Sequence, residues 1–232
     1  MHPYTESIRV LFAGHADPVA AVPMKRYMRD QFEYLGLKSQ RIGALRKDHL
    51  DRHGLPLLAD LDTILRELWA LPEREFQYVA TGLLGRLGNQ LPAEFIETLE
   101  FLLVTKSWWD TVDTISTGVV GLHFKRFPEV REVYLTKWRR SENFWLRRTS
   151  ILFQLNYKAE TDFDLLCEII HENLGSKEFF INKAIGWALR QHTRVDPAAV
   201  REFVTATPLH PLSAREALKW LEKRENKMSA AL

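Results

Sequence analysis

Apolar side chains recur along most of the chain at intervals of three and four residues, which is the period of an amphipathic α-helix. Between residues 57 and 71, for example, Leu58, Leu61, Leu65 and Leu68 form one stripe. No run of alternating apolar and polar residues is bounded by hairpin turns, so no sheet is expected. Proline, glycine and N-cap residues divide the pattern into predicted helices at 4–13, 17–36, 39–53, 57–71, 73–87, 92–104, 107–127, 128–140, 143–157, 162–173, 177–192, 197–206 and 213–225.

An internal repeat distinguishes between the two arrangements that many short helices allow, a globular bundle and a solenoid. Four five-residue segments, 76–80, 109–113, 145–149 and 180–184, each begin with an aromatic residue, and these aromatics are 33, 36 and 35 residues apart. That spacing is typical of a two-helix repeat unit of the tetratricopeptide or HEAT type. We therefore predict an all-α solenoid of about 12–13 helices, with one domain over residues 1–226 and a frayed tail over 227–232.

The second repeat differs from the others at its last position. Three of the segments have a small residue there, which lets neighbouring helices approach closely, whereas the second has Asp113. A charge at a packing position is costly unless it is paired or faces a cleft. Asp113 also follows Trp109 by four residues, so a helix would place the ring and the carboxylate on one face, where both attract a cation. The alternative is that the tryptophan fills the core and Asp113 forms a cap or a local salt bridge.

Charge is distributed unevenly along the chain, although the formal net charge is only +2. Residues 106–158 hold ten Lys or Arg against five Asp or Glu, whereas residues 1–100 hold twelve against fourteen. The basic excess therefore lies around and after Asp113. We expect it to contribute to a concave basic face of the solenoid, with Lys106 and Lys158 among the residues that bind nucleic acid.

Aromatic and basic residues are interleaved at two further places. On the predicted helix 177–192, Lys183, Trp187 and Arg190 are spaced i, i+4, i+7 and form one stripe. Near the N-terminus, Tyr27 lies among three basic residues. Cations that neutralise phosphates, together with rings that stack on sugars or bases, are what a nucleic-acid surface requires. The alternative is that Trp187 and Tyr27 are core residues that solvated cations merely flank.

Several other kinds of site are not indicated. The sequence has no zinc-type Cys/His spacing, no phosphate-binding glycine loop and no Gly-x-Ser-x-Gly elbow. His49 and His53 are four residues apart, but no third ligand is near them, so we expect a solvated helix face there. The single cysteine, Cys167, suits a reducing compartment. The N-terminus shows neither a signal-peptide core nor a transmembrane span, so we expect a cytoplasmic protein without a metal or nucleotide cofactor.

Six segments of the sequence are Met24–Met28, Ile64–Phe76, Val104–Asp113, Ile151–Leu155, Ser176–Ile181 and Lys183–Trp187. In these segments the sequence resembles the AlkD family of alkylpurine DNA glycosylases, which are built from HEAT-like helical repeats. The resemblance covers nearly the whole chain, and its longest runs, Lys-Ser-Trp-Trp-Asp and Lys-Glu-Phe-Phe-Ile, are specific. It implies a right-handed-curved α-solenoid of HEAT-like repeats.

The resemblance also implies an activity on double-stranded DNA that contains alkylated purines. A member of this family hydrolyses the N-glycosidic bond of cationic N3- or N7-alkylated purines, such as 3-methyladenine and 7-methylguanine, without flipping the base into a pocket. Carried over to this sequence, Trp109 and Trp187 lie against the deoxyribose of the lesion and Asp113 is the catalytic carboxylate. Arg148 and Tyr27 then contact DNA, and we expect a monomer in the bacterial cytoplasm that is associated with the nucleoid when bound to DNA.

Two other functions are compatible with the same helices. One is a noncatalytic HEAT-like repeat protein that binds branched or damaged DNA, and the other is a helical scaffold for a peptide partner. Neither requires a tryptophan and a carboxylate one helical turn apart, so the pair Trp109 and Asp113 favours the enzyme. Surface positions such as Arg41, Asn156 and Arg194 differ from the family pattern, so phosphate contacts at these positions are not carried over.

Overall fold

The computed structural model describes residues 1–229, with the backbone alone from residue 224 onward. Over this range the fold is all-helical, as predicted, and the one β contact is an isolated bridge between Glu33 and Glu73. Helices α1 to α14 are present, and α7, a π-helical segment and α8 follow one another without a break. If these three segments are counted as one continuous helix, the described range contains thirteen helices, in agreement with the number predicted.

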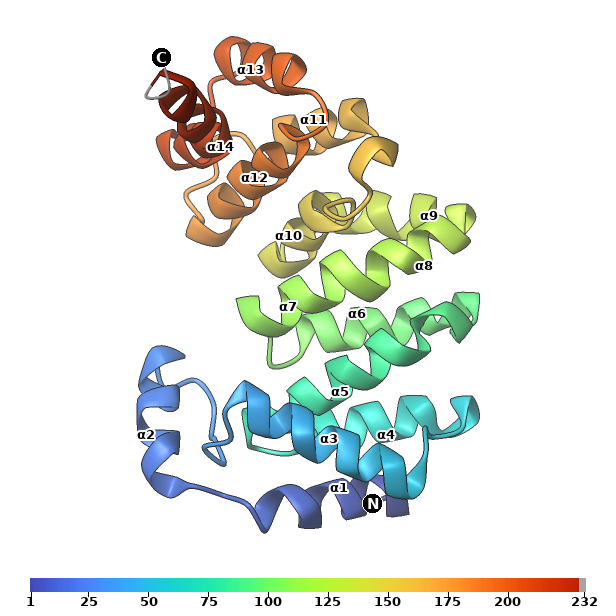
Figure 1. Ribbon diagram of the computed structural model, residues 1–232. Coiled ribbons are helices and arrows are strands. Elements are labelled where there is room, and N and C mark those ends of the chain that lie inside the picture. The colour runs from blue at the N-terminus through green and yellow to red at the C-terminus, as the bar shows by residue number, and fades with distance from the viewer. Residues whose placement is uncertain (230–232) are drawn as a thin grey trace. The chain divides into compact units, whose positions relative to one another are not determined.

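The chain forms two compact units, Met1–Thr98 and the part from Leu99 onward. Figure 1 shows the first in blue to cyan and the second in green to red. The first unit contains α1 (Pro3–Ala13), α2 (Pro18–Tyr27), α3 (Ser39–His53), α4 (Leu58–Ala70), α5 (Arg74–Leu87) and the short 3-10 helices Gly88–Gln90 and Ala93–Phe95. Helix α6 (Ile96–Val104) begins at the end of this unit.

The second unit continues with helices that follow the predicted repeats. They are α7 (Trp109–Ile115), the π-helical segment Ser116–Val120, α8 (Gly121–Arg126), α9 (Pro128–Arg139), α10 (Phe144–Leu152), the 3-10 helix Lys158–Glu160, α11 (Phe163–Glu172), α12 (Phe179–His192), α13 (Pro197–Ala206) and α14 (Pro211–Ser229). Helix α14 is longer than predicted and includes 227–229 of the expected tail, and residues 230–232 lie outside the described range.

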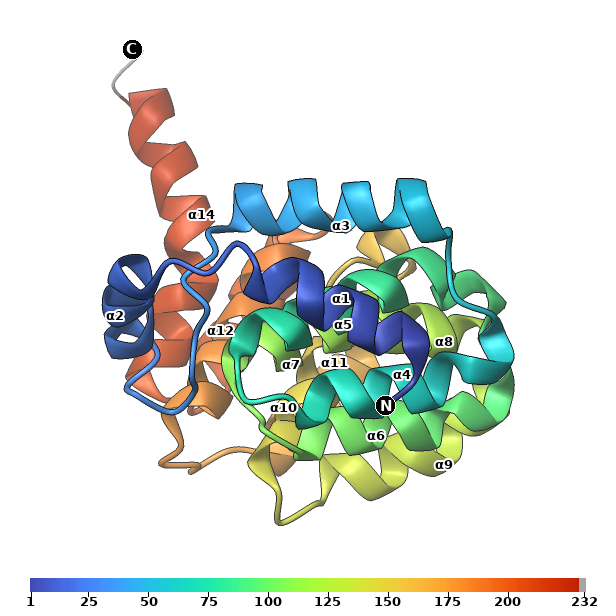
Figure 2. The same cartoon turned by 90° about the horizontal axis from the view of Figure 1, so that it is seen from below.

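In the first unit, α1 lies against α3 and α4 (Figure 2). The predicted leucine stripe of α4 forms part of this core, because Leu61, Leu65 and Leu68 are fully buried, although Leu58 at the start of the helix is exposed. Burial of an apolar side chain of this size contributes roughly 1.5–3 kcal/mol, so the stripe provides much of what holds α4 in place.

Helix α2 ends at Tyr27, so the prediction of a helix that continues to residue 36 was wrong. Arg29 and Asp30 have φ values of 56° and 55°, a left-handed conformation that an α-helix does not accommodate. The buried carboxylate of Glu75 instead accepts hydrogen bonds from the backbone N–H groups of residues 35, 36 and 37 at 2.9–3.0 Å. Gly36 is required in this loop because its φ is 89° and a Cβ would lie 2.0 Å from a backbone oxygen. Glu75 thus accepts hydrogen bonds from backbone amides that would have bonded within α2 if the helix had continued to residue 36.

The environment of one histidine in the first unit also differs from the one predicted. His49 is 3% exposed, and its Nε2 lies 2.7 Å from Oγ of Ser7, so the expected solvated helix face was wrong at this position. Its ring stacks on His53 at 4.5 Å. Burial and the neighbouring imidazole lower the pKa of His49 to about 4. Within the described range, no three His, Cys, Asp or Glu side chains are grouped as metal ligands, and no helix has the length and apolar character to cross a membrane.

In the second unit, α10 lies between neighbouring helices, with contacts to α7 and α9 on the preceding side and to α11 and α12 on the following side. Its N-terminus is set by Asn143, whose side chain accepts a hydrogen bond from the amide of Trp145 at 2.9 Å. Helix α10 ends at Leu152, five residues earlier than predicted. Gln154 beyond its end exchanges two hydrogen bonds with the backbone of Asp162, and these hold the loop to α11.

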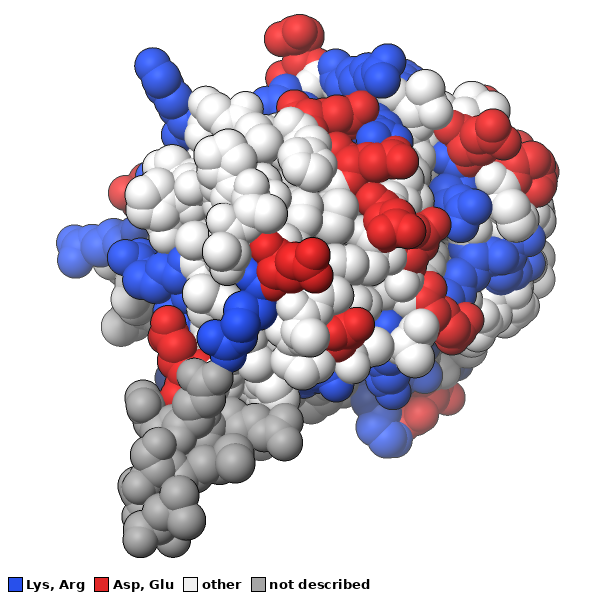
Figure 3. All heavy atoms as spheres, turned by 90° about the horizontal axis from the view of Figure 1, so that it is seen from above, with Lys and Arg blue, Asp and Glu red and all other residues white. Residues whose placement is uncertain are grey.

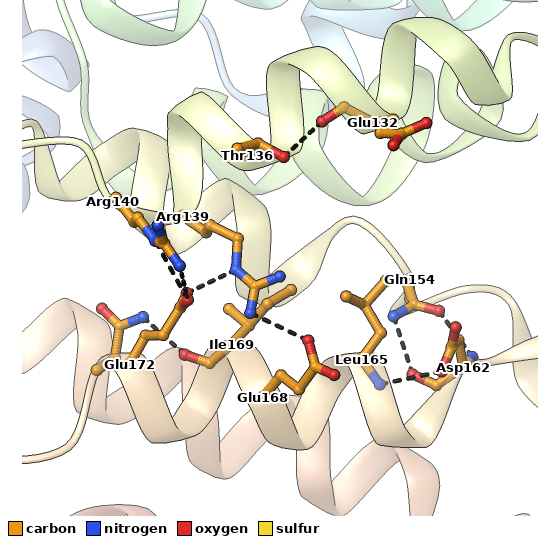
Figure 4. Close-up of polar contacts among 11 residues, drawn as sticks. Glu132, Thr136, Arg139, Arg140, Gln154, Asp162, Leu165, Glu168, Ile169 and Glu172 are labelled. Carbon is orange, nitrogen blue, oxygen red and sulfur yellow. Dashed lines mark hydrogen bonds and ion pairs between the residues drawn. The ribbon is translucent and has the colours of Figure 1, made fainter.

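Several cations of the basic segment 106–158 are paired with acids from outside that segment. Figure 4 shows Arg139 and Arg140 at the end of α9 pointing to Glu172 of α11, at 2.6 and 3.3 Å. Lys137 lies 2.6 Å from Glu100 of α6. On the face drawn in Figure 3, basic and acidic side chains are likewise intermingled. A count along the sequence therefore overstates the positive charge that this segment presents, and the expected basic face stays a prediction.

Candidate functional site

The start of α7 gives the two adjacent tryptophans different environments. Trp108 is the N-cap in extended conformation, and its buried ring packs edge-on against Trp145 and Phe180, with centroids 5.9 and 5.2 Å apart. Trp109, the first residue of α7, is half-buried and lines a pocket of ≈ 290 Å³. Asp113, one turn further along, lines the same pocket, in keeping with its i, i+4 relation to Trp109.

Arg148 of α10 binds both carboxylate oxygens of Asp113. Its Nε lies 2.7 Å from Oδ1 and its Nη2 lies 2.8 Å from Oδ2, a bidentate arrangement that fixes the plane of the carboxylate. A third nitrogen, Nη1, donates to the backbone oxygen of Phe180. The side chain of Arg148 is 5% exposed and that of Asp113 is 16% exposed. Arg148 is thus placed to position Asp113, and the DNA contact expected of it stays a prediction.

The same pair determines the protonation behaviour of Asp113. Burial raises the pKa of its carboxyl group above the usual value, and the hydrogen bonds and charge of Arg148 act in the opposite direction. Burial dominates because the pocket leaves little of the carboxylate in contact with water. The carboxyl group therefore takes up a proton at a higher pH than an exposed aspartate does.

Helix α12 contributes a second part of the pocket wall. Lys183, Trp187 and Arg190 all line it, so the stripe predicted from their spacing is present. Trp187 is half-buried, as Trp109 is, and neither ring is enclosed in the core. Two phenylalanines and a glutamate also line the pocket. The described residues that line it are Trp109, Asp113, Arg148, Phe179, Phe180, Lys183, Trp187, Arg190 and Glu216.

Glu216 of α14 binds the two cations of the α12 stripe. Its Oε1 lies 3.0 Å from Nζ of Lys183 and its Oε2 lies 2.5 Å from Nη1 of Arg190. Lys219, on the next turn of α14, pairs with the same carboxylate. Although burial raises the pKa of Glu216, these three cations outweigh it and lower the value to about 2. Lys183 and Arg190 are therefore not free cations, and the phosphate contacts expected of them stay predictions.

The remaining predicted residues lie outside the pocket lining. Lys106 precedes α7 in a left-handed conformation with φ of 48°, and Lys158 is exposed at the start of a 3-10 helix, also with a positive φ. Lys158 borders a separate shallow hollow beside His192. Tyr27 is 74% exposed at the end of α2, so it is not the core residue that was the alternative. It belongs to the first unit, whereas the pocket belongs entirely to the second.

Three pocket residues were missed in the sequence: Glu216, Phe179 and, as a lining residue, Phe180. Phe179 is 54% exposed at the first position of α12, and the specific Phe-Phe run was visible but had no assigned role. For Glu216 the available signal was Gly186, in the middle of α12. A Cβ there would lie 2.4 Å from Cβ of Glu216, so this glycine marks the close approach of α14.

Comparison with known proteins identifies the family to which the chain belongs. A sequence model of the DNA alkylation repair enzyme family matches residues 8–221. A solved structure described as a predicted DNA alkylation repair enzyme from Enterococcus faecalis is similar, with 32% identity and a TM-score of 0.82, over 89% of this chain and 96% of that one. No curated protein matches. The match over most of its length shows that this chain belongs to the DNA alkylation repair enzyme family.

Proposed function

We propose that this protein is a monofunctional DNA glycosylase that hydrolyses the N-glycosidic bond of cationic N3- and N7-alkylated purines, such as 3-methyladenine and 7-methylguanine, in duplex DNA. The observation that carries the proposal is the placement of Asp113 in one pocket with Trp109 and Trp187. A carboxylate and two rings are the groups that stabilise positive charge on a sugar. We propose further that the protein acts as a monomer in the bacterial cytoplasm, without a metal or nucleotide cofactor.

The lesion itself explains why so few groups suffice. Alkylation at N3 or N7 gives the purine a positive charge, so the base leaves as a neutral molecule with the electrons of the glycosidic bond. No acid is needed to protonate it. Water supplies the oxygen that bonds to C1′ and loses one proton. The protein has only to stabilise the oxocarbenium-like sugar that develops between these events.

Four residues of the pocket contribute to that stabilisation in different ways. The negative charge of Asp113 lowers the energy of the cationic sugar and can orient the attacking water. Ring faces of Trp109 and Trp187 add a cation–π attraction of about 0.5–2 kcal/mol each. Arg148 keeps the carboxylate in place before the substrate arrives, so no reorganisation is needed during the reaction.

The size and lining of the pocket support recognition of the sugar without base flipping. A volume of ≈ 290 Å³ is at the lower end of small-molecule sites and suits a sugar ring. Among the described residues, the lining contains no Asn or Gln to read the edge of an extruded base. Selectivity then arises from the lability of the lesion, because this modest stabilisation is too weak to release a neutral, undamaged base.

The test is release of the free base from a duplex that carries one 7-methylguanine or 3-methyladenine, followed by chromatography under single-turnover conditions. We expect release by the wild type and a loss on the order of 10²–10³-fold for Asp113→Asn, the scale of removing one preorganised electrostatic group. Asp110→Asn is the matched control, because Asp110 is on the same helix and outside the pocket lining. Near-normal release by Asp113→Asn would remove Asp113 from the mechanism.

A noncatalytic role in binding branched or damaged DNA is the second candidate. The observation that favours it is that Arg148 already pairs with the carboxylate of Asp113 in the absence of a ligand. In that case the wild type would bind the lesion duplex and release no base. Binding measured by fluorescence anisotropy on the same duplexes therefore separates the two functions.

A further inference from the structure

Two arginines of the first unit line one hollow beside a glycine in the middle of α5. The guanidinium group of Arg46, from α3, lies directly over Gly82, where a Cβ would come within 2.0 Å of its Cζ. Arg86 follows Gly82 by one helical turn, and both arginines line the same hollow, together with Tyr4 and His49. Glycine inside a helix costs roughly 1 kcal/mol relative to alanine, so the space that it provides for Arg46 has a measurable cost.

Neither guanidinium group has an anionic partner among the described residues. Other arginines of this unit, Arg9, Arg52 and Arg66, form ion pairs with acids on their own helices. Within the described part of the chain, Arg46 forms no ion pair with an acid although it is half-buried, and the neighbouring charge of Arg86 repels it. A half-buried, unpaired cation beside a second cation is unfavourable without an anion.

We propose that Arg46 and Arg86 form a phosphate-binding site that takes one backbone phosphodiester of duplex DNA. The planar guanidinium group presents paired N–H donors that match two phosphate oxygens, and two such groups can hold one phosphate between them. That the phosphate belongs to DNA rests on the proposed function. The evidence for the site itself is the position of the Arg46 guanidinium group over Gly82 and the lack, among the described residues, of an acid paired with Arg46 or Arg86.

The first experiment measures binding of an undamaged duplex as a function of salt by fluorescence anisotropy. Removing one phosphate contact lowers the slope of log Kobs against log salt by about 0.9. We expect that change, with a several-fold weaker affinity, in the double variant Arg46→Ala and Arg86→Ala. Arg52→Ala is the matched control, because Arg52 is on the same helix as Arg46 and already pairs with Asp48. An unchanged slope in the double variant, or an equal loss in Arg52→Ala, would overturn the site.

The second experiment moves the cation without removing it. In Gly82→Ala the new methyl group displaces the guanidinium group of Arg46, and the helix gains propensity, so we expect weaker duplex binding in a protein whose unfolding free energy is not reduced. Binding as tight as that of the wild type would contradict the claim that Gly82 positions Arg46 to bind a phosphate.

Two competitors identify the ligand. Inorganic phosphate, compared with chloride at equal ionic strength, tests a free anion, and polyglutamate tests an acidic peptide. The proposal expects the double variant to lose affinity for duplex DNA more than for either competitor; a loss confined to a competitor would refute it. An undamaged duplex undergoes no base release, so these outcomes are independent of whether the glycosylase proposal holds.

Discussion

Two carboxylates line the same pocket and are held in opposite ways. Asp113 on α7 is bound by one cation, Arg148, and burial raises the pKa of its carboxyl group. Glu216 on α14 is bound by three, and the pKa of its carboxyl group falls to about 2 although its side chain is only 6% exposed. The Asp113 pair is neutral as a whole, whereas the Glu216 cluster carries a formal excess of two positive charges.

The difference indicates how one pocket can serve two parts of a nucleotide. A carboxylate balanced by a single cation retains enough negative character to stabilise a developing positive charge beside it. A carboxylate surrounded by three cations cannot do so, and its cluster attracts anions instead. We therefore assign the sugar to the Asp113 wall and an adjacent phosphate to the Glu216 wall, as part of the proposed function. This assignment leads to four predictions.

The largest expected effect is on catalysis. Asp113→Asn should lower the single-turnover rate of base release on the order of 10²–10³-fold, whereas Glu216→Gln should lower it about tenfold or less. The reason is that the proposed function puts the cationic sugar beside Asp113, while Glu216 is occupied by three cations. Rates measured at saturating protein, so that binding differences cancel, check the comparison. Equal losses in the two variants would show that the two acids do not have separate roles.

Removal of a cation should also affect the two acids differently. Arg148→Ala leaves Asp113 without its partner in a largely buried position, and we expect a loss of about 3 kcal/mol in the free energy of unfolding. Arg190→Ala should cost less than about 1 kcal/mol, because Lys183 and Lys219 still neutralise Glu216. Denaturant titration of both variants gives these values.

The double variant of Arg148→Ala with Asp113→Asn provides the control for that measurement. It removes the unpaired charge as well as its partner, so most of the lost stability should return. If the double variant is as unstable as Arg148→Ala alone, the loss comes from packing of the arginine side chain and not from an uncompensated carboxylate.

Features that depend on nearby residues could be predicted from the sequence, whereas features that depend on distant residues could not. Helix period, caps and the 33- to 36-residue repeat are local signals, and they predicted the all-α architecture and the shared pocket face of Trp109 and Asp113. The end of α2 was wrong because it depends on Glu75, an acid 39 residues away from the glycine that it binds. Glu216 was missed for the same reason: Gly186, close to Arg190, marks the approach of another helix, but it does not identify a partner 26 residues beyond Arg190.

Acidification should change stability through the two acids with opposite signs. The pKa of Glu216 is lower in the folded protein, so its contribution is present above its usual value of 4.5 and is lost as the pH falls toward about 2. The pKa of Asp113 is raised by folding, so protonation favours the folded state over its own range. Between pH 5 and pH 3, Glu216→Gln should therefore lose less stability than the wild type, by on the order of 1–2 kcal/mol. Thermal unfolding across this range measures the difference, and parallel curves would contradict the low pKa of Glu216.

The smallest expected effect concerns affinity for undamaged DNA. Glu216→Gln removes the one negative charge of its cluster and leaves Lys183 and Arg190 able to meet a phosphate. We expect binding of an undamaged duplex to tighten several-fold at low salt, with a steeper salt dependence, because more counterions are released. Asp113→Asn should not do the same, since the cation that it frees, Arg148, is buried and donates to a backbone carbonyl. If both variants bind more tightly to the same extent, net charge alone governs affinity, and the two walls of the pocket do not recognise different parts of the nucleotide.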